Sequence, residues 1–460
     1  MKTLTPHIIA EITGGRYVGD EASRHNCVAG AARDNRDVMP GNLFICIRGA
    51  RADGHDFANI AFDSGAACCL AQRDIPDAKG PYVLVDSTLG SLKTIGAHYR
   101  RMFDIPVIGI TGSVGKTTSK EMVAAVLGAK YQVLKTPANL NNEIGVPLTL
   151  LSMDEHHEAA VIEMGISDFG EMSRLAEMVR PDIFMITRIG YAHLEQLGDL
   201  RGVLRAKTEA FACMDRQKGI AVLNGDDELL WGYDPGIRKL TYGFGRRNDY
   251  RAENARNEGT SAPARELMVV TPSARFAITI PAYGAHLAQA ALSAAVIGDL
   301  LGVAPEGIRR GVLSFETVGS RSNVTHTGCI TIIDDCYNAN PTSMRAAFES
   351  MSALPGRRVA VLGDMLGLGA DSDELHRDTG AYAVQSGIDA LLCLGEKAAL
   401  ILDGYLSAGG KTARHFQTKA DMIGALPELI LKGDNVLVKA SRGMQMEEVV
   451  EALDVLFHLA

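Results

Sequence analysis

A glycine-rich string near residue 112 limits what this chain can fold into more than any other feature. The apolar, β-branched run 106–111 predicts a buried strand, and the residues after Lys116 follow a helical pattern. The string between them consists of Thr111, Gly112, Ser113, Val114, Gly115, Lys116, Thr117 and Thr118. A strand, a glycine loop and a helix in this order let backbone N–H groups and the helix N-terminus converge on phosphate oxygens. The sequence therefore predicts a nucleotide-phosphate loop.

Two side chains in this loop suit a bound nucleotide. Lys116 would reach the terminal phosphates, and the Thr117 hydroxyl would help to hold Mg²⁺. The common pattern G-x-x-x-x-G-K-[ST] has glycine where this chain has Ile110, so the loop is the shorter T-G-x-x-G-K-T form. An ordinary glycine turn before a helix would not explain the lysine and the two threonines that follow it.

The length of the chain and its alternating pattern predict three domains. Its 460 residues exceed what one hydrophobic core usually serves. Residues 1–84 mix short strands with glycine turns, whereas 85–316 and 317–460 alternate strands with helices, as parallel sheets require. The third part fits a second, independent open sheet. We expect the polar segment 246–265 to be a surface loop.

Composition excludes several classes of protein. Apolar residues make up 47% and charged residues 22%, which is the range of globular proteins. A formal net charge of -9 argues against a nucleic-acid partner, which would favour a basic surface. The eight cysteines form no C-x-x-C pair, and neither a signal peptide nor a membrane span is visible. We expect a cytoplasmic monomer with reduced thiols and no membrane insertion.

Polar side chains follow two later predicted strands. Glu163 ends the apolar run 159–162, and His193 follows the run 183–187 after a short turn. Because functional groups in open α/β sheets gather at the carboxyl ends of strands, Glu163 is a candidate Mg²⁺ ligand. A solvated strand-end carboxylate and a structural histidine are the alternatives for these two residues.

Two longer strings combine turn-forming residues with amides. Residues 136–147 read T-P-A-N-L-N-N-E-I-G-V-P and contain Asn139 and Asn142; residues 334–341 read D-D-C-Y-N-A-N-P. Closely spaced asparagines can merely cap and turn the backbone. The strings also match T-x-x-N-x-N-N-x-x-G-x-P and D-D-x-Y-N-A-N-P, and these patterns carry a resemblance to a known family.

The chain resembles the Mur ligases and their folylpolyglutamate-synthetase relatives, and within them the MurF type. The likeness starts at the phosphate loop and covers the whole chain in order. It implies a three-domain α/β fold. A small N-terminal domain would bind the UDP-sugar, a central domain with a mostly parallel sheet would bind ATP, and a C-terminal Rossmann-like domain would serve D-alanyl-D-alanine.

The resemblance also implies roles for individual residues. Lys116, Glu163, His193 and a carbamylated Lys207 would form the catalytic and metal centre with ATP and two Mg²⁺ ions. The other implied nucleotide contacts are Asn139, Asn142, His286, Arg321 and Asp335. The implied substrate-binding residues are Arg36, Asp53, Gly54, His55, Asn338, Asn340, Asp364, His376, Lys439, Ser441 and Arg442. Several positions depart from the family pattern: Asn35, Arg188, Leu287, Ala290, Gly367 and Ala440.

The implied reaction is ATP-dependent ligation of D-alanyl-D-alanine to UDP-MurNAc-tripeptide through an acyl phosphate. Two alternatives stay open from the sequence. One is another Mur-family or folylpolyglutamate-type ligase, against which the two asparagine strings argue. The other is a catalytically idle subunit that binds nucleotide, against which intact Lys116, Glu163, His193 and Lys207 argue.

Overall fold

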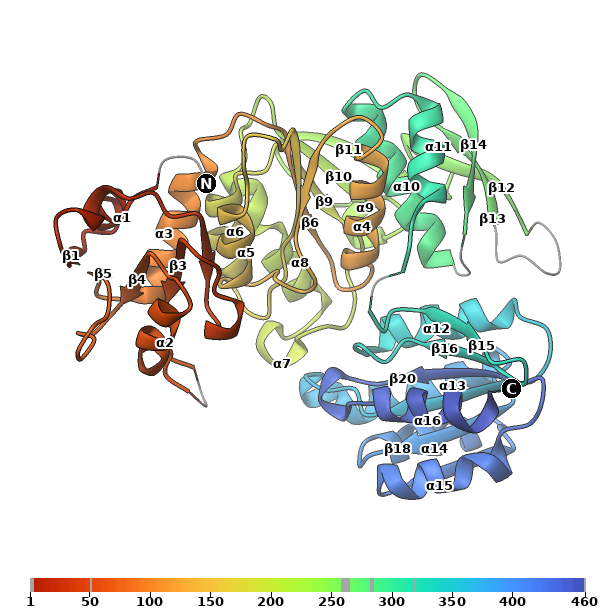
Figure 1. Cartoon of the computed structure of the whole chain (residues 1–460). Helices are drawn as coiled ribbons and strands as arrows, with labels where there is room; N and C mark the ends of the chain where they lie inside the picture. Colours follow the sequence, from red (N-terminus) through yellow and green to blue (C-terminus); the bar gives the residue numbers. More distant parts are fainter. Residues whose placement is uncertain (1–3, 50–51, 258–264, 282–284, 318, 459–460) are drawn as a thin grey trace.

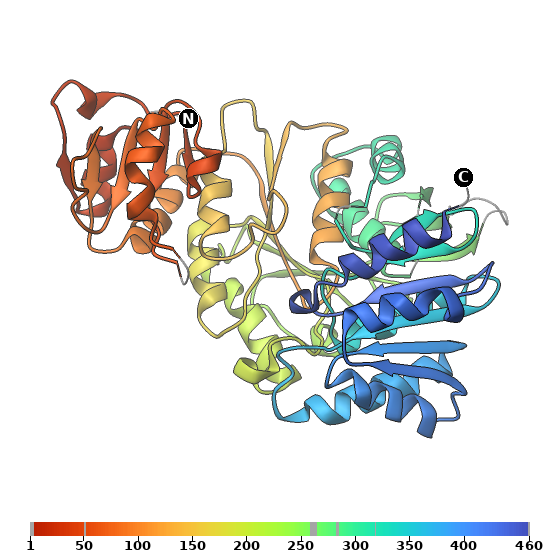
Figure 2. The same ribbon diagram turned by 60° about the horizontal axis from the view of Figure 1, so that its bottom comes forward.

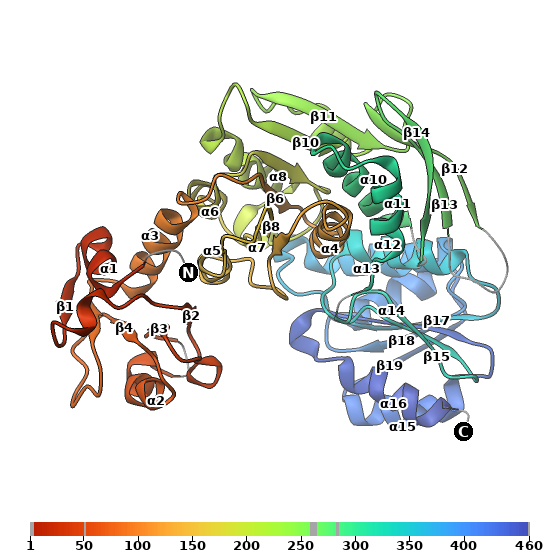
Figure 3. The same ribbon diagram turned by 45° about the horizontal axis from the view of Figure 1, so that its top comes forward.

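Three β-sheets follow one another along the chain. The computed structural model describes residues 4–49, 52–257, 265–281, 285–317 and 319–458. Figure 1 shows the N-terminal sheet, in red, on one side of the central domain and the C-terminal sheet, in blue, below it. In Figures 2 and 3 the central domain also lies between these two outer domains. The predicted three-part α/β architecture is confirmed.

The N-terminal sheet has the strand order β1-β5-β4-β3-β2, in which only β1 runs antiparallel to its neighbour. Its strands are β1 (Arg16–Val18), β2 (Gly30–Ala32), β3 (Asn42–Ile45), β4 (Cys68–Ala71) and β5 (Tyr82–Leu84). The helices of this part are α1 (Pro6–Thr13), α2 (Ala58–Asp63) and α3 (Thr88–Arg100). Helix α3 leads into the central domain and packs on α1, α5 and α6.

The central sheet has the order β14-β13-β12-β11-β10-β9-β6-β8-β7. Its strands are β6 (Val107–Thr111), β7 (Val133–Lys135), β8 (Ala159–Glu163), β9 (Ile183–Ile186), β10 (Ile220–Asn224), β11 (Arg238–Gly243), β12 (Tyr250–Asn257), β13 (Arg265–Val270) and β14 (Arg275–Ile280). Its α-helices are α4 (Lys116–Leu127), α5 (Gly145–Leu151), α6 (Glu171–Val179), α7 (Leu194–Leu197), α8 (Leu200–Thr208), α9 (Glu228–Trp231), α10 (Ala285–Leu300) and α11 (Pro305–Leu313).

The C-terminal sheet has the order β15-β16-β20-β17-β18-β19, and only β15 is antiparallel to its neighbour. Its strands are β15 (Asn323–His326), β16 (Thr331–Asp334), β17 (Arg358–Gly363), β18 (Ala390–Leu394), β19 (Thr412–Phe416) and β20 (Asn435–Lys439). Its α-helices are α12 (Pro341–Ser352), α13 (Ser372–Gln385), α14 (Ala398–Ser407), α15 (Lys419–Leu429) and α16 (Glu447–Phe457).

The order of the central strands decides where a site can form. Strand β6 lies between β8 and β9, and all three run parallel. The chain leaves β6 towards the edge strand β7, returns through β8, and then crosses to β9 on the other side. Such a reversal opens a crevice at the carboxyl ends of the strands, where open α/β sheets bind ligands. The segments after β6, β8 and β9 therefore meet at one edge of the sheet.

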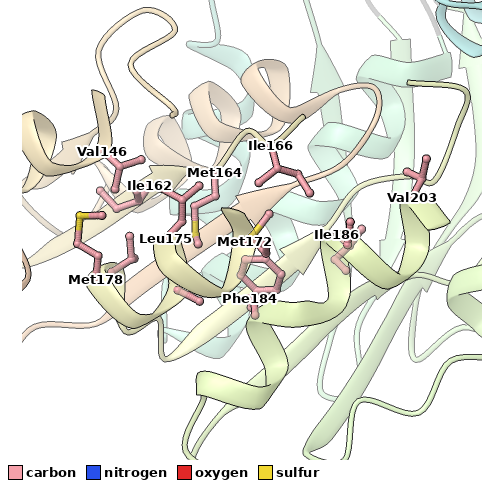
Figure 4. Close-up of a cluster of buried hydrophobic side chains, with 14 of the residues drawn as sticks. Val146, Ile162, Met164, Ile166, Met172, Leu175, Met178, Phe184, Ile186 and Val203 are labelled. Carbon is pink, nitrogen blue, oxygen red and sulfur yellow. The ribbon is translucent and has the colours of Figure 1, made fainter. Parts of the chain in front are cut away.

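A dense apolar layer supports this edge from below. Phe184 and Ile186 of β9 pack with Ile162 of β8 and with Met164, which directly follows β8. Helix α6 covers these side chains (Figure 4). Phe184 is fully buried and makes an edge-to-face contact with Phe211. Because such a core is as tightly packed as an organic crystal, it holds the strand ends in fixed relative positions.

Part of the segment 246–265 is not the surface loop that its polarity predicted, and residues 258–264 of it lie outside the described residues. Strand β12 occupies Tyr250–Asn257 and pairs with both β11 and β13. Tyr250 and Ala252 are buried, so one face of the strand joins the core while its polar neighbours face outward. Local polarity concealed a strand that the buried Tyr250 and Ala252 join to the core.

Helix α10 is rich in alanine and lies against α4. Small buried side chains, those of Ala288, Ala290, Ala291, Ala294 and Ala295, let the two helices approach closely. In the described part of the chain, no helix is both long enough and apolar enough to cross a membrane.

Candidate active site

The phosphate loop is held open by contacts with the segment that follows β9. Ser113 exchanges hydrogen bonds with Gly190, whose N–H donates to Ser113 Oγ (2.9 Å). Thr187 Oγ1 donates to the carbonyl of Val114 (2.6 Å). At Gly112 an added Cβ would lie 2.0 Å from Thr187 Oγ1, so only glycine allows this approach. The two segments therefore form one rigid anion-binding wall.

Helix α4 begins at Lys116, directly after Gly115. Gly115 has a φ of 83°, a left-handed conformation that favours glycine and lets the helix start at the loop. Lys116 Nζ donates to the carbonyl of Gly112 (2.8 Å), so the ammonium turns back over the loop. Desolvation lowers the pKa of Lys116, Glu163 opposes this shift, and the charge of Arg321 adds to it. A bound phosphate would relieve this crowding of cations.

Glu163 is a fully buried carboxylate at the end of β8. Its Oε2 accepts a hydrogen bond from Thr117 Oγ1 (2.8 Å), and its Oε1 accepts one from the amide of Asn141 (2.7 Å). No described Lys, Arg or His side chain forms an ion pair with it at hydrogen-bond distance. Hard oxygen ligands beside a phosphate loop match the preference of Mg²⁺. A divalent cation would supply the charge that this buried carboxylate lacks.

The asparagines of the 136–147 string have different positions. Asn141, which the sequence analysis did not select, contacts Glu163, whereas Asn142 Oδ1 accepts the N–H of Gly145 (2.9 Å) and supports the start of α5. Asn142 still lines the central cavity, but Asn139 does not. The repeated amides in the string were the signal for Asn141, and only the loop conformation distinguishes it from its neighbours.

His193 and Lys207 approach the same edge from the β9 side. His193 lies at the start of α7 with a φ of 55°, and its ring lines the cavity. Desolvation, together with the charges of Lys207 and Lys116, lowers the pKa of His193 to about 4. The imidazole is therefore neutral at neutral pH, with a nitrogen lone pair free to bind a metal.

Lys207, on α8, is 1% exposed and lies behind the cavity rather than in its lining. Burial lowers its pKa well below the ordinary value, and the charge of Lys116 lowers it further. Within the described residues no carboxylate pairs with it. A buried lysine in these surroundings favours the neutral amine.

The C-terminal domain supplies the opposite wall. Asp335, just after β16, accepts hydrogen bonds from Lys439 Nζ (2.5 Å to Oδ2) and from the N–H of Ser322 (3.0 Å to Oδ1). Lys439 also donates to the carbonyl of Asn338 (3.0 Å). This lysine therefore stabilises the loop after β16 and is not a free cation.

His286 connects the two domains. Its Nε2 lies 3.4 Å from Ser322 Oγ, and its Nδ1 is buried without a hydrogen-bond partner among the described residues. Burial lowers the pKa of this ring, with Asp335 raising it and Lys439 lowering it. The unpaired nitrogen leaves His286 able to accept or donate one further hydrogen bond.

A cavity of about 540 Å³ lies between the central and C-terminal domains. The structure brings these predicted residues to its lining: Ser113, Val114, Gly115, Lys116, Thr118, Asn142, Glu163, His193, His286, Arg321, Asp335, Asn338, Asn340 and Lys439. The domains also touch directly, since the N–H of Tyr191 donates to Thr342 Oγ1 (3.3 Å). Sequence reasoning missed Asn141, Ser322 and Tyr337, which line the same cavity.

Four predicted substrate residues of the C-terminal domain do not line this cavity. His376 is fully buried; its Nε2 accepts the N–H of Met365 (3.0 Å) and its Nδ1 lies 2.6 Å from the carbonyl of Ser372. Asp364 accepts the N–H of Ala398 (2.7 Å), and Ser441 Oγ accepts that of Leu366 (2.8 Å). These three residues hold loop ends in place. Arg442, which pairs with Glu447, is also outside the lining.

The predicted N-terminal residues lie away from this cavity as well. Arg36 pairs with Asp34, and the hydrogen bond from the Arg36 guanidinium lowers the pKa of that carboxyl group. His55 is buried between Asp53 and the N–H of Gln72, which donates to its Nε2 (2.9 Å). At Gly54 an added Cβ would lie 2.7 Å from the backbone of Ile47. His55 thus fixes a turn of the N-terminal domain.

The described residues contain no group of three or more His, Cys, Asp or Glu side chains arranged to hold a metal. A cation at Glu163 would therefore need ligands of other kinds, such as the Thr117 hydroxyl, a modified lysine and the phosphates of a bound nucleotide. This ligand set is typical of Mg²⁺, which retains waters and binds few protein carboxylates.

Comparison with known proteins agrees with this geometry. Residues 29–99 match the Mur ligase family catalytic domain, 110–298 the Mur ligase middle domain, and 320–442 the Mur ligase glutamate ligase domain. The UDP-N-acetylmuramoyl-tripeptide--D-alanyl-D-alanine ligase of Bacillus subtilis is 37% identical over 97% of both chains. MurF of Acinetobacter baumannii has a TM-score of 0.88 at 29% identity over 98% of both chains. MurF of Thermotoga maritima, solved with ADP, has a TM-score of 0.81 at 27% identity over 93% of this chain and 97% of its own. The chain belongs to the Mur ligase family.

Proposed function

We propose that this chain is the ATP-dependent ligase that joins D-alanyl-D-alanine to UDP-MurNAc-tripeptide. One observation carries the proposal: a phosphate loop, a buried strand-end carboxylate and groups from a second domain surround one cavity. The MurF relatives, whose names describe this reaction, match nearly the whole chain. Their names also favour this substrate pair over the other Mur-family and folylpolyglutamate-type ligases.

The first step activates the terminal carboxylate of the tripeptide. One carboxylate oxygen attacks the γ-phosphorus of ATP, and the bond from this phosphorus to the β,γ-bridging oxygen breaks. ADP leaves, and the tripeptide carries an acyl phosphate. Lys116, the loop N–H groups and the N-terminus of α4 stabilise the charge on the transferring phosphoryl group. Arg321, from the segment that enters the C-terminal domain, adds a positive charge when the domains are closed.

Mg²⁺ fits the residues at the strand ends. Thr117, Glu163 and His193 would hold it together with phosphate oxygens, and Asn141 would keep Glu163 oriented. When bound, the ion neutralises charge on the transferring phosphoryl group. The buried Glu163 carboxylate and the neutral His193 ring support this assignment.

Lys207 fits a carbamate. Its neutral amine would attack CO₂: an N–C bond forms, the electron pair of one C=O bond moves to oxygen, and the nitrogen loses a proton. An uncharged amine thereby becomes an anionic carbamate, which would be attracted to Lys116 and would add a ligand for a second Mg²⁺ ion. The burial of Lys207 and its lowered pKa support the modification.

The second step forms the amide. The amine of D-alanyl-D-alanine attacks the acyl carbon, the bond to the phosphate oxygen breaks, and phosphate leaves while the amine gives up a proton. The C-terminal domain would hold the dipeptide with Asn338 and Asn340, and the N-terminal domain, with Arg36 and Asp53, would hold the UDP-sugar. Fixing both substrates between domains supplies much of the rate advantage.

Phosphate release from ATP tests the function. The protein is supplied with UDP-MurNAc-tripeptide and D-alanyl-D-alanine, singly and together. Release that requires both, with a product of pentapeptide mass, is the expected result. Release with a single amino acid instead would keep the family and overturn the substrate pair. ATP binding without release under any pairing would favour the idle nucleotide-binding subunit.

Substitution of Lys207 tests the carbamate. We expect Lys207→Ala to lose activity by at least about 10- to 100-fold, since loss of even the outer-shell partners of metal ligands typically costs this much. A small carboxylate added in solution should restore part of it by occupying the space of the carbamate. Unchanged activity in Lys207→Ala would remove this residue from the mechanism.

A further inference from the structure

The face of an aromatic ring packs against a cation of the interdomain linker. Arg321 precedes the C-terminal sheet, and its guanidinium carbon lies 3.8 Å from the ring centre of Tyr337. Both side chains line the cavity that contains Lys116. The charge of Arg321 also contributes to the lowered pKa of Lys116, which places the two cations near each other.

The backbone fixes this ring relative to the linker. The N–H of Tyr337 donates to the carbonyl of Ser320 (3.0 Å), and the N–H of Ser322 donates to Asp335 Oδ1 (3.0 Å). Lys439 holds the other oxygen of Asp335. Because these contacts lie on both sides of Arg321, the ring and the arginine backbone move together.

Arg321 is held differently from several other arginines in the chain. Arg36, Arg174 and Arg442 each pair with a carboxylate, although the Arg442 guanidinium also lies 5.7 Å from the ring centre of Tyr337. Arg321 has no carboxylate partner among the residues that the structure describes. A guanidinium held by a ring face keeps its full charge and its in-plane N–H donors, whereas a carboxylate would neutralise the charge and occupy the donors.

We propose that Tyr337 is a positioning residue that keeps Arg321 ordered and unneutralised for the phosphates of a nucleotide. This inference rests on the proposed function, because it needs a nucleotide at the loop. A free arginine side chain samples many rotamers, and restricting them before binding lowers the entropy lost on binding. The phenol hydroxyl is not required, since the ring face makes the contact.

The affinity for a non-hydrolysable ATP analogue, AMPPNP with MgCl₂, measures this effect without turnover. Calorimetry would compare the wild type with Tyr337→Phe, Tyr337→Leu, Arg321→Met and the Tyr337→Leu/Arg321→Met double variant. We expect Tyr337→Leu to raise Kd by about 3- to 30-fold, as loss of a cation–π contact predicts. Tyr337→Phe should stay near the wild-type value, and Tyr337→Leu should add little in the Arg321→Met background.

A second cation–π pair provides a matched control. Arg345 lies over Tyr382 at 4.9 Å, on α12 and α13 and outside the cavity lining. Tyr382→Leu removes the same kind of contact and should leave AMPPNP affinity unchanged. Thermal melting checks that each variant folds, and Tyr337→Met replaces the leucine variant if that one does not.

Three results would overturn the inference. Wild-type affinity in Tyr337→Leu would show that Arg321 needs no ring. An equal loss in Tyr337→Phe would assign the effect to the hydroxyl. An equal loss with and without Arg321 would mean that the ring contacts the nucleotide itself. A wild-type chain that fails to bind AMPPNP would instead overturn the proposed function and this inference together.

Discussion

At the scale of single residues, neighbouring side chains of one type have different tasks. Asn141 donates to Glu163, while Asn142, the next residue, caps the turn into α5. Lys116 reaches over the phosphate loop, while Lys120, one turn later on α4, is fully buried. The sequence does not distinguish the two asparagines or the two lysines. Their hydrogen-bond partners show which residue belongs to the site and which stabilises the surrounding backbone.

Asn141→Ala should weaken the use of Mg²⁺. Glu163 would lose the donor that orients its Oε1, and loss of such a supporting contact typically costs about 10- to 100-fold in metal affinity or activity. The Mg²⁺ concentration for half-maximal phosphate release measures the effect. Asn142→Ala is the neighbouring control and should lower thermal stability with a smaller change in Mg²⁺ dependence. Equal Mg²⁺ dependence in Asn141→Ala and the wild type would contradict this role.

At the scale of elements, α4 serves as both binding site and anchor. Its first turn carries Lys116 and Thr117. On its second turn, Lys120 Nζ donates to the carbonyls of Thr136 (2.7 Å) and Ala138 (3.3 Å) and pairs with Glu121. Helix α4 thereby fastens the loop that delivers Asn141 to Glu163, so phosphate and metal groups share one rigid support.

Lys120→Met should destabilise the fold by at least about 1–3 kcal/mol, because buried carbonyl acceptors would lose their donor. Urea unfolding measures the loss. Lys135 also pairs with Glu121 but is half exposed, so Lys135→Met should cost less than about 1 kcal/mol. Similar losses in the two variants would mean that the buried contacts of Lys120 do not hold the loop.

At the scale of the whole molecule, charged contacts connect the domains. Glu143, in the loop before α5, accepts hydrogen bonds from Lys93 on α3 (2.5 Å) and from Arg174 on α6 (2.6 Å). Helix α3 leads out of the N-terminal domain, so this cluster joins it to the central domain beside the cavity. Although burial raises the pKa of Glu143, Arg174 and Lys93 lower it below its ordinary value overall.

Stability should therefore depend on pH through Glu143. A carboxylate with a lowered folded-state pKa stabilises the fold above its unfolded pKa of about 4.3, and this contribution is lost as pH falls through the folded value. Glu143→Gln should be less stable than the wild type at pH 7 by up to about 1 kcal/mol, since the partners are partly exposed. The difference should shrink as pH falls below about 4.3 and disappear once Glu143 is protonated in the folded state.

Urea unfolding of the wild type and of Glu143→Gln, at pH values from about 3 to about 8, measures this difference in the free energy of unfolding. The exposed Glu155 has no ion-pair partner among the described side chains, and Glu155→Gln should follow the wild type at every pH. A constant gap between Glu143→Gln and the wild type down to acid pH would contradict the assignment.

The local sequence alone determined the phosphate loop, the buried strands and most helix positions, because each depends on residues that are close together in the chain. Strand–glycine–lysine order and apolar periodicity are properties of a few consecutive residues. The same reasoning failed for β12, where backbone pairing with β11 and β13 outweighed local polarity. The family resemblance added the role of each domain and most of the candidate site residues.

Tertiary structure decided which candidates meet. Thr117, Glu163 and His193 converge because β6 lies between β8 and β9, and strand order is a long-range property. Burial distinguishes Lys207 from an ordinary exposed helix lysine. His376 lies outside the candidate cavity, because its ring accepts a hydrogen bond from a backbone loop. The contact of Tyr337 with Arg321 likewise depends on how a linker packs against a strand end. Side-chain environment is created by packing, so no local pattern can predict it.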